Sequence, residues 1–355
     1  MKTKSKNIFA FNIPFYFLVI TVTGLCGVFY FINASSKHNN SQVIQTPEVV
    51  SDCNLNIVRR TDLKLTKPMV LFDKEGQDAH LNSLKESILS FINEQKVSGN
   101  VSSVSVYLRE LNDGNWISIN EGELYSPGSL MKVPTLITIL KDVQKNPAIL
   151  EKELFFRRHF GGIPEQTITG PALAEGRSYK VKELLRYMIE FSDNDATATL
   201  NNEVNFETMT KLFTDMNQIL PNKQQQDYPI SAVEFSKYFH VLFNASYLNV
   251  DMSEYALDLL SKSAYKDGLM RGIDSNITVA HKFGERNVNG EQQLHEFGIV
   301  YLGNNPYLIG VLTKGKNNKV LPLCISGISK IVFDYMKELD VDKGIDLNTL
   351  LIKQF

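Results

Sequence analysis

The chain has 355 residues, of which 43% are hydrophobic and 21% are charged, and this suits a folded unit of one or two domains. The formal net charge is −2, and basic residues gather only within the first six positions, so the charge pattern argues against nucleic acid as a partner.

The N-terminal region has the pattern of a membrane anchor. No charged residue occurs between Asn7 and Ser36, and residues 13–32 are mostly apolar over a length that can cross a bilayer core as a helix. We therefore assign residues 1–35 to a cytoplasmic N-terminus and one transmembrane helix. Lysines precede the span, so the positive-inside bias predicts that the rest of the chain is extracytoplasmic, in the periplasm or at the cell surface. A cleavable signal peptide is the alternative, although its apolar region would be shorter.

The next stretch predicts a tether, a helix and a hairpin. Residues 36–74 are assigned to a tether and lead-in segment, because the chain is polar and lacks apolar periodicity over residues 34–52. Residues 81–96 carry apolar side chains at helical spacing. Residues 101–111 and 115–125 alternate apolar and polar side chains around the turn sequence NDGN, which predicts a β-hairpin.

A helical block separates this hairpin from three further strands. Apolar side chains recur at helical spacing from residue 129 to about 271, and a final helix is expected at 324–339. The predicted strands between them are 276–284, 295–303 and 306–315. Strands on both sides of a helical block predict an α+β fold, in which an antiparallel sheet is flanked by helices and an all-helical subdomain is inserted.

We place this folded domain at residues 75–355, with the α/β part at 75–128 and 276–355 and the helical part at 129–275. The cleft between the two parts is the expected position of a functional site.

The first chemical motif is a Ser-x-x-Lys pair, Ser129 and Lys132, at the start of the helical block. Residues i and i+3 share one face of a helix, and the N–H groups at a helix N-terminus favour negative charge. This stretch alone is compatible with a catalytic pair and equally with an N-cap serine beside a solvated lysine. A second such pair, Ser263 and Lys266, is interpreted as a surface pair within a helical segment.

Two later motifs favour the catalytic interpretation. The sequence Ser-Asp-Asn at residues 192–194 lies between two helical segments, and the Lys-x-Gly sequence of Lys282 and Gly284 lies at the end of a strand. The order Ser-x-x-Lys, Ser-Asp-Asn and Lys-x-Gly resembles the motif set of class A β-lactamases and penicillin-binding proteins, over roughly residues 78–339.

The resemblance implies a serine acyl-transfer reaction. Ser129 would be the nucleophile that attacks a carbonyl carbon, and Lys132, neutral for part of the time because it is buried, would accept its proton. Lys282 would lower the pKa of Lys132 by cation repulsion. Asp193 is expected to be structural and to hold its loop by hydrogen bonds to the backbone.

The same resemblance assigns the groups that bind the substrate and its leaving group. Ser192 would pass a proton to the leaving nitrogen, and Asn194 would hydrogen-bond the substrate amide. The oxyanion would lie between the backbone N–H groups of Ser129 and Glu285, directly after Gly284.

Two departures from the family pattern limit the expected activity. Phe283 occupies the substrate-binding position where the family has Thr or Ser, and it cannot donate a hydrogen bond to a substrate carboxylate; the following strand also lacks the family's arginine. In class A β-lactamases, a glutamate in a Glu-x-x-Leu-Asn loop activates the hydrolytic water, whereas residues 217–229 contain no glutamate here. Glu203 and Glu207 follow Ser192 too closely to replace it. Weak deacylation is therefore expected.

These features predict a membrane-anchored serine hydrolase or acyltransferase that forms an acyl-enzyme on an amide substrate, such as a peptidoglycan stem peptide or a β-lactam. A true class A β-lactamase is one alternative, and a binding or sensor protein of the same fold without turnover is another. The sequence has no HExxH, Cys-x-x-Cys or Gly-rich phosphate-loop motif, so no cofactor or metal is expected.

Four further residues are not expected to take part in the reaction. Cys53 and Cys324 would form a disulfide in an oxidising compartment or remain two separate buried thiols, and the sequence leaves both open. His281 and His295 are interpreted as structural histidines.

Overall fold

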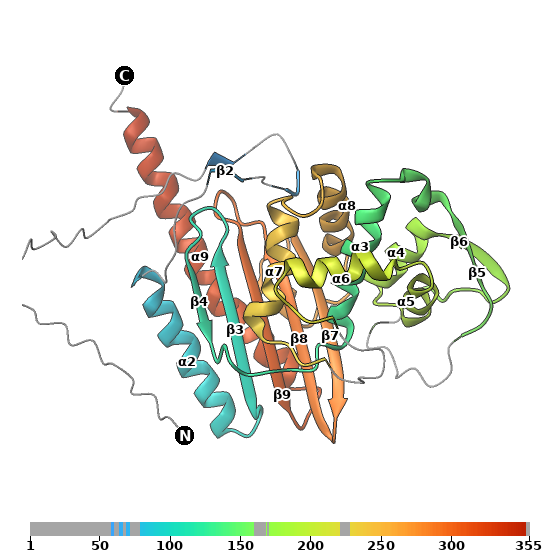
Figure 1. Cartoon of the computed structure of the whole chain (residues 1–355). Coiled ribbons are helices and arrows are strands. Elements are labelled where there is room, and N and C mark those ends of the chain that lie inside the picture. Colours follow the sequence, from blue (N-terminus) through green and yellow to red (C-terminus); the bar gives the residue numbers. More distant parts are fainter. Residues whose placement is uncertain are drawn as a thin grey trace, which may run out of the picture. The chain divides into compact units, whose positions relative to one another are not determined.

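A five-stranded antiparallel sheet joins distant parts of the chain (Figure 1). The computed structural model describes residues 58–59, 64–66, 69–71, 79–159, 168, 170–220 and 228–352. The strand order is β4-β3-β9-β8-β7, which leaves β7 at one edge and confirms the predicted sheet. The strands are β3 (Ser103–Glu110), β4 (Trp116–Ile119), β7 (Val279–Val288), β8 (Glu291–Val300) and β9 (Tyr307–Gly315).

The sheet is buried on both faces, which explains why its central strands are apolar on both sides. Successive side chains of a strand point to opposite faces. In β8, Phe297 and Ile299 therefore enter one hydrophobic core, and Leu294 and Val300 enter the other.

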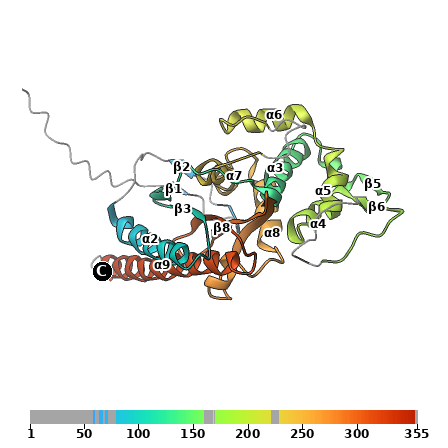
Figure 2. The same ribbon diagram turned by 90° about the horizontal axis from the view of Figure 1, so that it is seen from below.

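Two helices cover one face of the sheet, α2 (Asn82–Val97) and α9 (Leu321–Ile352), and they lie side by side in Figure 2. Gly327 of α9 permits this close approach, because a Cβ atom there would overlap the ring of Phe91. α9 extends past the predicted end at residue 339. Cys324 is a buried free thiol in this layer. Cys53, its candidate disulfide partner, lies outside the described residues.

The helical subdomain covers the opposite face. Phe235 and Phe239 of α7 pack their rings against Phe297 of β8, with ring centroids 4.8 and 6.2 Å apart. The α-helices of this part are α3 (Lys132–Val143), α4 (Val181–Glu190), α5 (Asn194–Asn201), α6 (Phe206–Asp215), α7 (Ala232–Phe243) and α8 (Val250–Ser261). Short 3-10 helices occur at η1 (Ala79–Leu81), η2 (Gly128–Met131), η3 (Pro147–Glu151) and η4 (Leu269–Gly272).

Two details of the helical block differ from the prediction. The block contains a small antiparallel hairpin, β5 (Glu153–Phe156) and β6 (Arg177–Lys180), whose four-residue strands are too short to give a clear period. α8 ends at Ser261, so the second Ser-x-x-Lys pair does not lie within a helix. Ser263 is buried and only Lys266 is exposed, which rules out the predicted surface pair.

Leu65 and Thr66, in the segment before the first long helix, contact α8. β1 (Val58–Arg59) pairs with β2 (Met69–Leu71). Between them, Leu65 is buried in the core beside the helical subdomain.

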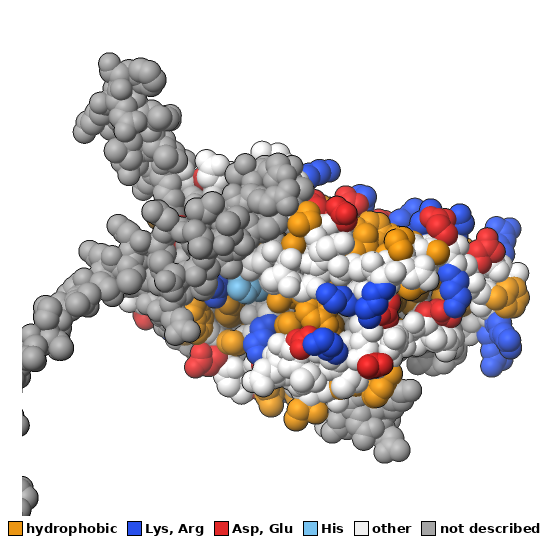
Figure 3. All heavy atoms as spheres, turned by 45° about the horizontal axis from the view of Figure 1, so that its top comes forward, with side chains coloured by type: hydrophobic (Ala, Val, Ile, Leu, Met, Phe, Trp, Pro, Cys, Tyr) orange, Lys and Arg blue, Asp and Glu red, His pale blue; other side chains and the backbone are white. Residues whose placement is uncertain are grey.

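No helix in the part of the chain that the structure describes has both the length and the apolarity needed to span a membrane. The predicted span at residues 13–32 lies outside the described residues. On the face shown in Figure 3, acidic and basic side chains are interspersed, in line with the small net charge.

Candidate active site

Ser129 lies in the short helix η2, directly against the edge strand β7. Gly128 has a φ of +53°, and a Cβ atom there would overlap the backbone of Glu285. A Cβ atom on Gly284 would lie 2.7 Å from the backbone nitrogen of Leu130. Glycine at both positions therefore allows the backbone around Ser129 to approach that of Glu285, as an oxyanion site formed by two backbone N–H groups requires.

Lys132 is the first residue of α3, which begins there and not at Ser129 as the sequence suggested. Its side chain is buried, and its Nζ donates to the backbone oxygen of Ser192 and to Oδ1 of Asn194, the latter at 2.7 Å. The Oγ atom of Ser192 lies 3.1 Å from the same nitrogen. No hydrogen bond joins the Ser129 hydroxyl to Lys132 among the described residues, and such bonds are often long in unliganded enzymes.

The turn between α4 and α5 presents Ser192 and Asn194 to Lys132. Ser192 has a φ of +54°, an uncommon conformation for a residue with a side chain. Asp193 fixes this turn as the N-cap of α5, since its Oδ1 accepts a hydrogen bond of 2.6 Å from the backbone N–H of Ala196. Asp193 thus has the backbone-holding contact expected of a structural residue.

Lys282 reaches the same hydroxyl from the sheet. Its side chain is fully buried, and its Nζ lies 2.9 Å from Oγ of Ser192 and 2.8 Å from the backbone oxygen of Phe283. The same nitrogen lies 4.2 Å from the centroid of the Phe283 ring, a cation–π geometry. The hydroxyl of Ser192 therefore lies between two lysine amines.

Burial lowers the proton affinity of both amines. Desolvation lowers the pKa of Lys132 to about 7, although Asp193 and Glu285 act in the opposite direction. Desolvation also lowers the pKa of Lys282, and the nearby Lys132 ammonium lowers it further. Because the two amines repel when both are charged, the site favours a single proton shared between them at neutral pH.

Phe283 is buried instead of facing solvent. Its ring stacks on that of Tyr265, with centroids 4.3 Å apart and planes 19° apart. Position 283 therefore offers an aromatic surface beside the Lys282 amine and no hydroxyl. Tyr265 was not predicted as a neighbour of the site, because it lies in a loop after α8 where periodicity carries no information.

The two histidines near the site are both completely buried, which agrees with a structural interpretation. His295 Nε2 lies 3.1 Å from the backbone oxygen of Ser126. His281 Nδ1 lies 2.6 Å from Oε1 of Glu296, which is also completely buried. The sequence analysis did not single out Glu296, and its only signal was an acidic residue within an apolar strand.

The site consists of amines, hydroxyls, an amide and backbone N–H groups, which can move protons and stabilise an oxyanion. Within the described ranges, no group of three or more His, Cys, Asp or Glu side chains is arranged to hold a metal ion.

Comparison with family models gives a match over most of the folded domain. The model of the β-lactamase enzyme family matches residues 83–336. No relative was found among the curated proteins.

Several solved structures have the same fold. PBP-A has a TM-score of 0.63 and 18% identity, covering 76% of this chain and 100% of its own. A β-lactamase from Chitinophaga pinensis DSM 2588 has a TM-score of 0.62 and 20% identity, covering 72% of this chain and 100% of its own. The TLA-1 extended-spectrum β-lactamase has a TM-score of 0.61 and 18% identity, covering 72% and 99%. These likenesses establish the fold.

Proposed function

The chain belongs to the β-lactamase enzyme family, and from that premise we propose that it forms an acyl-enzyme through Ser129 on an amide substrate. The substrate class is a β-lactam or a cell-wall peptide such as a peptidoglycan stem peptide. In keeping with the N-terminal sequence, the protein would act outside the cytoplasm while anchored in the membrane.

The hydrogen bonds of Lys132 are the main support for this proposal, because they fit a neutral amine that acts as a base. A neutral amine has two N–H donors and one lone pair. The two donors match the backbone oxygen of Ser192 and Oδ1 of Asn194. The third neighbour of this nitrogen is Oγ of Ser192 at 3.1 Å, so the lone pair of the neutral amine faces a serine hydroxyl with which it can exchange a proton. A pKa of about 7 makes the neutral form available at neutral pH.

Ser192 supplies the route for the second half of acylation. Its hydroxyl lies within 3.1 Å of the Lys132 amine and 2.9 Å of the Lys282 amine. After Ser129 attacks the carbonyl, the proton taken by Lys132 passes to Ser192 and from there to the leaving nitrogen. The oxyanion would be stabilised by the backbone N–H groups of Ser129 and Glu285.

The comparisons support a penicillin as the first substrate to test. A variant of PBP-A was solved as an acyl-enzyme complex with penicillin G. In this chain, however, Phe283 replaces the hydroxyl expected at its position, and its ring is held against Tyr265. Substrates without a carboxylate at this point should therefore be accepted at least as well as penicillins.

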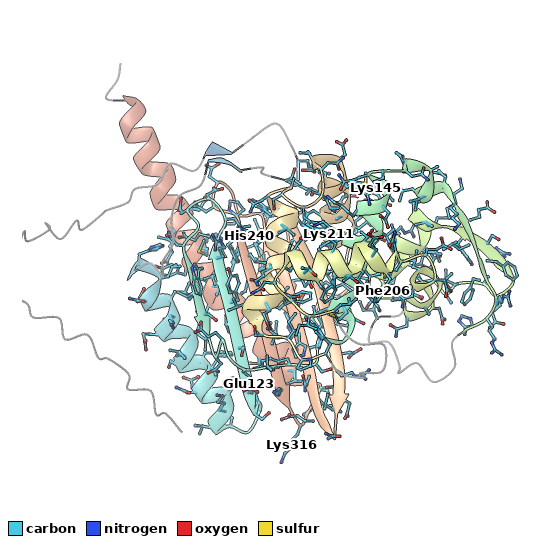
Figure 4. All side chains as sticks on the ribbon, in the orientation of Figure 1. Glu123, Lys145, Phe206, Lys211, His240 and Lys316 are labelled. Carbon is cyan, nitrogen blue, oxygen red and sulfur yellow. The ribbon has the colours of Figure 1, made fainter. Side chains whose placement is uncertain are left out.

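Slow deacylation follows from the sequence between α6 and α7. Residues 217–229 contain no glutamate that could activate water. Glu203 forms an ion pair with Lys152 at 2.5 Å, and Glu207 lies exposed in the first turn of α6, whose start is marked by Phe206 in Figure 4. These contacts favour a long-lived acyl-enzyme over an efficient class A β-lactamase.

Intact-mass spectrometry after incubation with a fluorescent penicillin tests the proposal. The wild-type protein should gain the mass of one adduct that persists for minutes, and Ser129→Ala should abolish it. Ser263→Ala is the matched control, since it changes the other Ser-x-x-Lys serine and should leave the adduct intact. Rapid hydrolysis without adduct would favour the β-lactamase alternative, and a protein that never gains mass would favour the binding or sensor alternative.

A further inference from the structure

The loop that leads into Ser129 is held by two side chains of the sheet strand β8. The backbone N–H of Ser126 donates to Oε1 of Gln293 at 2.9 Å, and the backbone oxygen of Ser126 lies 3.1 Å from Nε2 of His295. Gln293 and His295 are two positions apart on β8, so both side chains point to the same face of the sheet. The peptide groups on both sides of Ser126 are therefore bound to one strand.

The surroundings of His295 fix which of its ring nitrogens carries the hydrogen. The backbone N–H of Thr313 donates to Nδ1 at 3.3 Å, so Nδ1 is the acceptor. Nε2 then carries the hydrogen and donates it to the Ser126 oxygen. Burial lowers the pKa of His295 to about 3, so the ring is uncharged at neutral pH and keeps this arrangement.

Tyr125 holds both the ring of His295 and the start of the loop. The two rings meet edge to face, with centroids 5.3 Å apart and planes 79° apart. The hydroxyl of Tyr125 lies 3.0 Å from the hydroxyls of Ser103 and Ser105 on β3. Its backbone N–H and oxygen both pair with the backbone of Ile230. The chain is thus already fixed at the residue before the two contacts with β8.

Pro127 explains why the loop needs side chains as anchors. A proline has no backbone N–H, so this residue cannot donate a backbone hydrogen bond to the sheet. Its oxygen is bound within η2, where it accepts from the backbone N–H of Leu130 at 3.1 Å. The nearest upstream groups that can fix the direction of the chain into η2 are those of Ser126. Buried backbone groups are costly when unpaired, so the two contacts favour one position of the loop.

His295 connects the two backbone segments that would form the oxyanion site. Its side chain binds Ser126, three residues before Ser129. On the edge strand β7, its cross-strand partner is Gly284, the residue before Glu285. Gly284 allows β7 to approach the loop, because a Cβ atom there would overlap the loop backbone. The distance between the N–H groups of Ser129 and Glu285 therefore depends on how the loop is held against β8.

We propose that His295 and Gln293 are positioning residues, which hold Ser126 against β8 and so set the spacing of the two oxyanion N–H groups. This inference rests on the proposed acylation of Ser129, and it adds the groups that keep the nucleophile loop at the edge of the sheet. Preorganised N–H donors stabilise an oxyanion because they do not rearrange as its charge develops. Loss of their support should therefore slow the acylation step itself and affect substrate binding less.

Two variants of His295 separate the hydrogen bond from packing. His295→Phe keeps an aromatic ring beside Tyr125 and removes the donor to Ser126, so acylation at saturating fluorescent penicillin should slow about tenfold, with a smaller change in the half-saturating concentration. His295→Gln offers an amide N–H near the position of Nε2 and should restore most of the rate. Rates are taken from the time course of the protein that becomes acylated, so they do not depend on the fraction folded. An unchanged rate in His295→Phe, or an equal loss in both variants, would overturn the inference.

A double variant tests whether the two side chains act through the same residue. Gln293→Met removes the acceptor for the Ser126 N–H at similar side-chain length, and it should also slow acylation. Because both contacts hold one residue, the variant with Gln293→Met and His295→Phe together should lose less than the product of the two single losses. Fully multiplicative losses would contradict a shared action through Ser126. Should His295→Phe not fold, Gln293→Met alone still decides whether the contact with β8 supports acylation.

Ser329→Ala is the matched control. Ser329 of α9 is completely buried, and its hydroxyl donates to the backbone oxygen of Leu269 at 2.9 Å. This change also removes a buried side-chain donor to a distant backbone oxygen, so it should lower stability and leave the acylation rate unaltered. An equal slowing of acylation in Ser329→Ala would show that general destabilisation is responsible and would overturn the inference.

Hydrogen exchange measured by mass spectrometry tests the anchoring of the loop without any substrate. In the full-length protein, the peptide that covers residues 123–131 should exchange faster in His295→Phe and Gln293→Met than in the wild type, and Ser329→Ala should leave it unaltered. Unchanged exchange in both loop variants would overturn the inference. A wild type that never gains the adduct mass would contradict the proposed function, and faster exchange in the loop variants would then still support the anchoring by β8.

Discussion

At the scale of single residues, the burial of Lys132 has two opposite effects. It destabilises the folded protein, and it supplies the neutral amine that the reaction needs. A lysine has an ordinary pKa of 10.5, and burial lowers that of Lys132 to about 7. The unfolded chain therefore holds a proton that the folded chain releases between these two pH values. Because the unfolded state binds more protons there, the free energy of unfolding should rise as pH increases from about 7 to about 10.5.

Lys132→Met should remove this pH dependence. The variant has no amine to desolvate, so its free energy of unfolding should exceed that of the wild type by roughly 1–3 kcal/mol at or below pH 7, with a gain that shrinks towards pH 10. Acylation should be lost at the same time. Urea unfolding at several pH values measures the first effect, and a wild type and variant with parallel pH dependence would contradict the burial argument.

The pH dependence of acylation is a second prediction for Lys132. The amine accepts a proton only when neutral, so the acylation rate of the wild type should rise as pH increases through about 7. Rates of adduct formation between pH 5.5 and 8.5 measure this. A rate that is already constant below pH 6 would indicate a base other than Lys132.

A third prediction concerns the effect of Phe283 on substrate choice. Phe283→Thr introduces a hydroxyl beside Lys282, so acylation by a penicillin should gain about tenfold relative to its carboxylate methyl ester. The loss of stacking on Tyr265 should lower the free energy of unfolding by about 2–4 kcal/mol. The ratio of the two acylation rates is the measurement, because it is independent of the fraction folded. An unchanged ratio would show that position 283 does not contact this part of the substrate.

At the scale of elements, the N-cap of α5 connects helix stability to the chemistry of Ser192. Asp193→Ala removes the cap bond to Ala196, which should lower the free energy of unfolding by about 1 kcal/mol and slow acylation by loosening the turn. Asn205→Ala is the matched control, because Asn205 caps α6 through the backbone N–H groups of Glu207 and Thr208.

The control should lose a similar amount of stability without slowing acylation. Denaturant unfolding and adduct formation measured on both variants separate the two effects. Equal rates in Asp193→Ala and the wild type would show that the cap does not position Ser192.

The elements also explain how far the sequence could predict the fold. Strands and helices with several apolar side chains on one face have a clear period, so the strands of the sheet and the helices around them were predicted, although α9 runs on to Ile352, past the predicted end at residue 339. The hairpin β5–β6 and the break of α8 at Ser261 were missed, since both depend on a few residues and on tertiary contacts.

The three motifs placed Lys132, Ser192 and Lys282 in one site. The Glu296–His281 pair was missed because cross-strand register has no signal in a single sequence.

At the scale of the whole molecule, the lead-in segment is docked onto parts of the chain far from it in sequence. The Glu254 carboxylate accepts hydrogen bonds from the backbone N–H groups of Leu65, at 2.7 Å, and of Thr66. The hydroxyl of Tyr301 donates to the Leu65 oxygen at 2.8 Å. Since Leu65 and Thr66 are also buried, these two residues are part of the folded domain.

The contacts of Leu65 and Thr66 limit where a protease can cut, and this adds to a prediction about the membrane anchor. If residues 13–32 span the membrane with the folded domain outside, protease added to intact cells or spheroplasts should cut within residues 33–52, which are polar and lack apolar periodicity. The released fragment should begin before residue 64, because a protease needs an extended backbone and Glu254 holds the backbone of Leu65. N-terminal sequencing of that fragment is the measurement. Cleavage only after cell lysis would reverse the proposed orientation, and a stable fragment that begins after Thr66 would contradict the docking of the lead-in segment.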